Sequence, residues 1–318
     1  MSYQITTAQV QQFNTNVGML VQQMGSRLRG AVQIQQLTGK AATVLEQFGA
    51  TNPVYNLGRH ADTPILDVPQ DRRWVYPTDV EWGALIDDQD KLRLLIDPTG
   101  PYTQQSVATL GRGVDDQIIS AFFGSNNTGE NGSTATGTLY AYGSNSQSVA
   151  ATTGAAAATG LNIAKLRAAK RLLLQADVDV DNDELYAVIT AKQHDDMLNE
   201  AQAISLDYNT RPVLVDGKIS SFMGFNFIHS ERIPGGANFA TSLNSGISSA
   251  DSDGSYVTNS RWMVPVFAKS GVALGMWNDI NTQIDKRADK RFATQVYTKM
   301  TIGATRLEEK RCVLINCK

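Results

Sequence analysis

The feature that most limits the fold is one long amphipathic helix, predicted to end at Gly124. Asp97-Pro98 is a favourable start, because Asp can cap a first turn and Pro has no useful donor to lose there. A start one turn later, at Gly100-Pro101, remains open. Apolar residues then recur at spacings of three or four: Val107, Leu110, Val114, Ile118 and Phe122. A helix of roughly 24 residues is about 36 Å long, which is unusual for one element of a compact fold.

Shorter helices and strands follow and predict an α+β fold. Residues 161–178 form a second amphipathic helix, residues 185–190 a short strand, and Thr190 caps a third helix. Residues 218–234 resemble a strand that is interrupted at Gly224. Residues 262–277 and 292–317 are strand-like, and their side chains alternate clearly between two faces from Phe292 to Ile302.

Residues 58–86 predict a long hairpin that mixes polar and aromatic residues. We place its turn at residues 69–72, because Pro69 fixes φ and Asp71 favours a turn. Three prolines in this stretch cannot donate ladder hydrogen bonds, which suits an exposed two-stranded ribbon. An isolated ribbon is marginally stable in water, so we expect it to lie on another surface. Its second strand presents alternate residues on one face: Trp74, Tyr76, Thr78, Val80, Trp82, Ala84 and Ile86.

The remaining segments lack the apolar area of a core. Residues 7–29 are rich in glutamine and weakly helical, and we expect an arm that needs a partner surface. Residues 124–160 and 235–260 are rich in Gly, Ser and Asn, which is typical of irregular excursions. The N-terminus lacks the layout of a signal peptide, and no apolar run approaches the ~18 residues of a membrane span. We therefore expect the product to stay where it is made.

No catalytic, cofactor or metal site is predicted, and we expect no enzyme. The three histidines lie far apart and none begins a zinc-binding spacing. Residues 177–184 resemble the opening of a calcium loop, but Asn182 stands at the position of its invariant glycine. Cys312 and Cys317 are five positions apart, an odd separation, so on a strand they would face opposite ways as unpaired thiols. The adjacent carboxylates Asp115-Asp116 also point in different directions.

Charge is unevenly distributed, although the net charge is only −3. Residues 1–45 contain Arg27, Arg29 and Lys40 and no acid, which offers weak, non-specific affinity for phosphate. Acids outnumber bases nine to five in residues 59–97, whereas bases outnumber acids nine to four in residues 285–318. This asymmetry suggests surfaces that face different surroundings. No recognised nucleic-acid reading module is present.

In this order, the segments resemble a major capsid protein of tailed bacteriophages with the Hong Kong 97-like fold. The likeness covers nearly the whole chain and includes IDDQDKLRLLIDPTGPY, GRGVDDQIISAFFG, GKISSFMGFNFIHSERIP and VYTKMTIGATRLEEKRCVLINC. It implies an N-terminal arm (1–35), an entry segment of the peripheral domain (36–57) and an extended hairpin, the E-loop (58–90). It further implies a peripheral domain with a spine helix (91–160), an axial domain (161–277) and peripheral return strands (278–318).

The resemblance implies a shell subunit that forms hexamers and pentamers of an icosahedral head around packaged DNA. Expected partners are a separate scaffolding protein, a portal and, as an open alternative, decoration proteins, with no membrane; assembly is expected in the host cytoplasm and the final location in the virion. Some relatives join subunits through a lysine near the E-loop, but residues 58–90 contain none, so we expect non-covalent contact. Arg27, Arg29 and Lys40 are the candidates to face the lumen or DNA. Candidates for subunit contact are Asp71, Arg72, Arg73, Trp74, Tyr76 and Trp82.

Three other functions remain open at this stage. An encapsulin-type shell shares the fold but encloses cargo enzymes, so the contents of purified particles would distinguish it. A monomeric, β-rich surface-binding protein would remain a monomer in light scattering. A hydrolase built from dispersed Asp and His residues would lose turnover when the three histidines are replaced.

Overall fold

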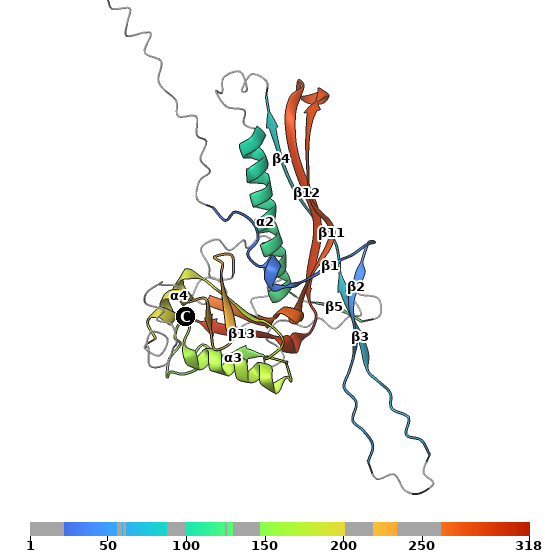
Figure 1. The fold of residues 1–318 in the computed structure, drawn as a ribbon, viewed down its shortest axis with the longest axis vertical. Helices are drawn as coiled ribbons and strands as arrows, with labels where there is room; N and C mark the ends of the chain where they lie inside the picture. Colours follow the sequence, from blue (N-terminus) through green and yellow to red (C-terminus); the bar gives the residue numbers. More distant parts are fainter. Residues whose placement is uncertain are drawn as a thin grey trace, which may run out of the picture. The chain divides into compact units, whose positions relative to one another are not determined.

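A computed structural model describes residues 22–55, 59, 62–87, 99–124, 126–129, 147–200, 219–233 and 262–318. The chain divides into two compact units, which we describe separately. Unit 1 comprises Met1–Gly25, Val80–Arg112 and Ile280–Met300, and unit 2 comprises Ser26–Asp79, Gly113–Asp279 and Thr301–Lys318. The described helices are α2 (Thr99–Phe123), α3 (Ile163–Gln175) and α4 (Ala191–Leu198) (Figure 1). Within these ranges, no helix is long and apolar enough to cross a lipid bilayer.

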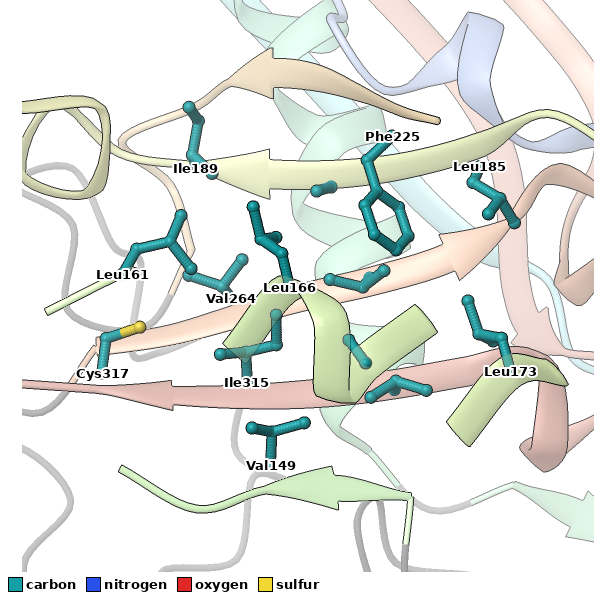
Figure 2. Close-up of a cluster of buried hydrophobic side chains, with 14 of the residues drawn as sticks. Val149, Leu161, Leu166, Leu173, Leu185, Ile189, Phe225, Val264, Ile315 and Cys317 are labelled. Atoms are coloured by element: carbon teal, nitrogen blue, oxygen red, sulfur yellow. The ribbon is translucent and has the colours of Figure 1, made fainter. Parts of the chain in front are cut away.

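The core of unit 2 is a six-stranded sheet covered by α3. Its order is β6-β13-β10-β7-β9-β8, and β10 is antiparallel to both β13 and β7. Leu166 of α3 lies beside Val264 and Ile315 of the strands, and Leu173 of the same helix belongs to the same buried cluster (Figure 2). These four side chains are at most 1% exposed, so their burial is a main source of stability. The strands are β6 (Ser148–Val149), β7 (Leu185–Ile189), β8 (Ser221–Phe222), β9 (Phe225–His229), β10 (Trp262–Ala268) and β13 (Cys312–Cys317).

Local sequence signals position the helices and turns around this sheet, and the predicted cap at Thr190 is among them. Asn162 caps α3 by accepting a 2.8 Å hydrogen bond from the backbone N–H of Lys165. At the start of α4, the side chain of Gln193 accepts a hydrogen bond from the backbone N–H of Thr190. Met223 and Gly224 both have positive φ in the two-residue turn between β8 and β9, which confirms the predicted interruption.

The C-terminal strand lies in this sheet rather than with the preceding return strands. Six residues of β13 pair with six of β10, from Trp262↔Cys317 to Phe267↔Cys312. The expectation that grouped residues 312–317 with residues 278–306 is therefore wrong for the strand itself. Cys312 and Cys317 are both free and buried, as predicted. Burial raises the pKa of both thiols, that of Cys317 to about 12.

The predicted hairpin at 58–86 is wrong, because its predicted second strand, residues 74–86, is divided between two sheets. β3 (Gln70–Val75) is the middle strand of a three-stranded sheet with β2 (Ala42–Phe48) and β5 (Asn127–Thr128). The proposed turn at 69–72 instead continues as β3, paired with β2. Pro77 separates β3 from β4 (Thr78–Ile86), which joins another sheet. The alternating pattern of residues 74–86 therefore combined two strands on either side of a proline.

The third sheet has the order β1-β11-β12-β4. Its strands are β1 (Gln33–Gln36), the long β11 (Val272–Arg287) and β12 (Ala293–Arg306), and β4. β1 is parallel to β11 in the register Gln33↔Ala273. Alternation is confirmed in β12 and from Val80 to Ile86 of β4, because the side chains on one face are less exposed than those on the other. The predicted long helix is also confirmed: α2 has 25 residues and contributes to both units, although the predicted cap at Asp97 lies outside the described residues.

Candidate assembly surface

The most exposed paired element of unit 2 is the ribbon that β2 and β3 begin. We call residues 42–55 and 62–75 the β2–β3 ribbon; its outer arms are residues 49–55 and 62–69 (Figure 1, blue). The antiparallel register runs from Ala42↔Val75 to Phe48↔Gln70. One further backbone hydrogen bond, 2.7 Å from Gly49 N–H to the carbonyl of Pro69, extends the pairing outward. The predicted turn residues thus lie at the root of the ribbon, not at its tip.

Three predicted contact residues fasten this root to the rest of unit 2. Arg73 is only 5% exposed; its Nε donates to the carbonyl of Leu307 at 3.0 Å and its Nη1 to the carboxylate of Asp71 at 2.9 Å. The same carboxylate accepts from the N–H of Gly129 at 3.1 Å. The indole Nε1 of Trp74 donates to the carbonyl of Gly129 at 2.7 Å. These side chains are used within the subunit, so Arg73 in particular is structural.

The other three predicted contact residues have different surroundings. Arg72 is exposed and pairs with Glu46 on the neighbouring strand, with Nε and Oε1 3.2 Å apart. Tyr76 is exposed just beyond the end of β3. Trp82 belongs to unit 1, where its ring lies 6.4 Å from that of Tyr102. The structure brings Asp71, Arg72, Arg73 and Trp74 together and places Trp82 in the other unit.

The outer arms carry apolar side chains that the subunit leaves uncovered. Ile65 is 92% exposed, Tyr55 78% and Phe48, where the first arm begins, 68%. Large apolar side chains scattered singly on a surface are common, but these lie along the two arms, and no buried core lies beneath them within the described part of the chain. Sequence reasoning missed this feature because it paired the wrong strands. The exposed apolar side chains of the ribbon are Leu45, Phe48, Val54, Tyr55, Ile65, Leu66 and Val68.

The basic residues predicted to face the lumen contact separate parts of unit 2. The guanidinium of Arg27 is exposed and donates to the carbonyl of His229 at 2.7 Å. Arg29 forms a 3.0 Å ion pair with Asp279. Lys40 is exposed. Since Arg29 has an acidic partner, the three residues do not act as one uniform positive patch.

The segment that precedes β1 is held by a buried carboxylate of α2. Asp115 is fully buried and accepts hydrogen bonds from Ser26 Oγ at 2.5 Å and from the N–H groups of Arg27 and Leu28, each at 3.1 Å. The neighbouring Asp116 instead binds the guanidinium of Arg232, with its Oδ1 2.6 Å from Nε. The two carboxylates therefore point to different partners, as the sequence predicted. A carboxylate that accepts several donors in this way anchors local structure.

The other residues considered for chemistry take part in local contacts. His194 Nε2 accepts from the N–H of Ile219 at 3.3 Å, and His60 lies outside the described residues. In the acidic turn, Asp179 accepts from the side-chain amide and the backbone N–H of Asn182 and from the N–H of Asp181, and these hydrogen bonds lower its pKa. Among the described residues, no group of three or more His, Cys, Asp and Glu side chains could hold a metal ion.

Comparison with known proteins agrees with a shell subunit. A family model described as "Phage capsid protein" matches residues 5–318. The capsid of cyanophage P-SCSP1u has a TM-score of 0.72 at 13% identity, covering 99% of this chain and 94% of that chain. The capsid of cyanophage Pam1 gives 0.70 at 15% identity, covering 98% and 97%. A native GTA particle capsid gives 0.66 at 12% identity, covering 98% and 96%.

A search of curated proteins gives no match. At these low identities, the structural matches establish the fold, an α+β capsid fold that spans nearly the entire chain. The family model covers far more than half of the sequence, so it shows the family to which the chain belongs, which structural similarity at low identity does not. On that evidence, the chain belongs to the phage capsid protein family.

Proposed function

We propose that this capsid subunit assembles into the icosahedral head of a tailed bacteriophage and encloses packaged double-stranded DNA. Membership of the phage capsid family supports a structural role. Subunits would form hexamers and pentamers, with a separate scaffolding protein and a portal as partners; decoration proteins remain an open alternative. Assembly would take place in the host cytoplasm and the product would be part of the virion. Arg27 and Lys40 are exposed and remain candidates for contact with DNA.

The observation that carries this proposal is the apolar ribbon. Ile65, Tyr55 and Phe48 would each be stabilised by about 2 kcal/mol if a neighbour covered them fully. A free two-stranded ribbon is marginal on its own, whereas a large interface would cover it. We propose that the ribbon performs the role expected of the E-loop, with residues 42–75 in place of 58–90. The other segment boundaries remain predictions.

The contact made by the ribbon is proposed to be non-covalent. Residues 42–75 contain no lysine, and neither does the segment 58–90 first assigned to this role. An isopeptide bond that starts from a lysine of the ribbon therefore has no donor in either range. The ribbon is held rigidly at its root by the hydrogen bond from Arg73 to the carbonyl of Leu307, without a covalent link.

The proposal is tested by replacing apolar residues of one arm. Ile65→Ser with Leu66→Ser should leave the circular dichroism and melting temperature of the subunit unchanged but lower the yield of particles in negative-stain microscopy at least about tenfold, since roughly 4 kcal/mol of contact is lost at each ribbon. The matched control is Leu85→Ser, because Leu85 and Leu66 are both 49% exposed. Normal particles from the double variant would refute the role of the ribbon. Nuclease-protected DNA in wild-type particles, rather than cargo protein, distinguishes the phage head from an encapsulin-type shell.

A further inference from the structure

A groove lies along the outer face of α3, within unit 2. Its volume is about 500 Å³, and α3 forms its floor. One wall is the segment at Thr153-Gly154, which precedes the helix, and the other is Met223 in the turn between β8 and β9. The inner face of α3, with Leu166 and Leu173, is already used by the core (Figure 2). The groove therefore lies on a different side of the helix, although Ala168 and Met223 also pack against the edge of the core.

Hydrogen bonds fix both walls of the groove to α3. Asn162 donates from Nδ2 to the carbonyl of Thr153 at 3.1 Å and also caps the helix. Lys170 donates from Nζ to the carbonyl of Met223 at 3.0 Å. Met223 and Gly224, both at positive φ, form the tight turn that joins the paired strands β8 and β9, so this wall is rigid. The groove is thus preformed, which lowers the ordering cost of binding.

The rim of the groove is basic. Arg167, Lys170 and Arg171 all line it, and no acidic residue does. The side chains of Arg167 and Arg171 are exposed, and neither forms an ion pair with any described residue. Spacings of three and four residues bring the three cations onto one side of the helix. This side of α3 therefore presents a concentrated positive charge that the described part of the subunit does not neutralise.

The floor of the groove is apolar and shallow. Ala164 and Ala168 are small residues one turn apart, and Leu174 is 50% exposed at the far end. An apolar floor beneath a cationic rim fits a helix that carries leucine-like residues next to glutamate or aspartate. Phosphate groups of nucleic acid need the cations but gain nothing from the apolar floor. Two copies of the groove facing each other would repel.

We propose that this groove of α3 is a docking site for an acidic amphipathic helix of a partner protein. The partner places carboxylates against Arg167 and Arg171 and an apolar side chain on Ala168. Lys170 already donates to the carbonyl of Met223, so it holds the wall of the groove in place and adds less to the affinity for the partner than the two arginines do. The site lies on α3 and is separate in sequence from the β2–β3 ribbon, so partner docking and ribbon contact can fail independently.

The test uses the full-length chain in unassembled form and a defined probe. The probe is a synthetic helical peptide of about 18 residues, with glutamates along one face and leucines beside them, long enough to form a helix. Its binding is measured by fluorescence anisotropy. We expect saturable binding that weakens about tenfold when Arg167→Gln and Arg171→Gln are combined, since two ion pairs with the peptide are lost. Ala168→Phe, which fills the floor without changing charge, should also weaken binding.

A matched control removes two positive charges elsewhere on the same unit. Lys192→Gln with Lys310→Gln has the same change in net charge, and both lysines are exposed outside the groove. This variant should bind the peptide as the wild type does. Equal loss in the control, or equal binding of a peptide with lysine in place of glutamate, would overturn the proposal.

Three further outcomes would also overturn it. If the peptide does not bind the wild-type chain saturably, the groove is not a docking site for an acidic helix. Tighter binding of a short DNA duplex than of the peptide, abolished by Arg167→Gln and Arg171→Gln, would assign the groove to nucleic acid. Self-association in sedimentation that the same two changes abolish would assign it to a second copy of the chain. Unchanged melting temperatures of the variants ensure that altered binding does not result from unfolding.

Discussion

Replacing Arg306 with methionine should severely destabilise unit 2. Arg306 is completely buried, and its Nη1 donates to three carbonyl oxygens at the end of α2, those of Ala121, Phe122 and Gly124. Its Nε is 2.9 Å from the carboxylate of Glu309, which is also nearly buried. Methionine matches only the aliphatic part of arginine and has no donor. The change therefore leaves three acceptors and one negative charge without their partner.

The magnitude follows from the burial of the pair. Removing one member of a buried ion pair costs about 3–5 kcal/mol, because the remaining charge stays in a poorly solvated site. Asn126 still donates to Glu309 at 2.5 Å, so we expect a value near the lower limit, about 3 kcal/mol. With a urea m-value of about 3 kcal/mol/M, the unfolding midpoint should fall by about 1 M.

The assay is urea unfolding of the unassembled chain, followed by tryptophan fluorescence. Arg311→Met is a matched control, because Arg311 also pairs with a glutamate three residues away, Glu308, at 2.7 Å, but both side chains are about 40% exposed. That change should cost less than about 1 kcal/mol. If Arg306→Met costs no more than Arg311→Met, the reasoning from burial is wrong. Arg306→Met combined with Glu309→Met should cost less than the sum of the single changes.

Three other predictions concern the ribbon root, the sheet and the thiols. Gly303→Ala should destabilise the chain by more than about 1 kcal/mol in the same assay, since the new Cβ would overlap the carbonyl oxygen of Tyr76; an unchanged midpoint contradicts this. Arg73→Glu should impair folding, because Arg73 is buried and the reversed charge would have no partner there; a folded, soluble variant would contradict it. Cys312 and Cys317 should not react with a thiol reagent at pH 8 until the chain is unfolded, since burial raises the pKa of both. Because the pKa of Cys317 in the folded chain (about 12) exceeds its unfolded value near 8.5, the stability it contributes is complete below about pH 8 and is lost between about pH 9 and 12.

Elements whose signals are local were predictable from the sequence. The helix α3, its cap at Asn162 and the turn at Gly224 depend on residues within a few positions of one another. The 25 residues of α2 likewise follow from their apolar spacing and the glycine at their end. For these elements, the periodicity of a helix or the conformation of one turn is sufficient information.

The candidate contact surface was not predictable in the same way, because it depends on strand pairing. β2 and β3 pair across residues 49–69, and nothing in the alternation of residues 74–86 reveals that partner. Pro69 was interpreted as the start of a turn, whereas its carbonyl accepts the bond from Gly49 that continues the ladder. Arg73 seemed to be an exposed charge because its acceptor, the carbonyl of Leu307, is 234 residues away. Exposure and burial of single charges are therefore properties of the tertiary structure.

The position of β13 within its sheet has a consequence for synthesis of the chain. β13 lies between β6 and β10, and Val313 and Ile315 complete the core on which α3 packs. This sheet cannot close until residues 312–317 have been made, although all of its other strands are translated earlier. A nascent or prematurely terminated chain therefore lacks a finished core. A chain that stops before residue 312 would leave the apolar face of α3 partly uncovered, so we expect it to misfold before it could act as a subunit.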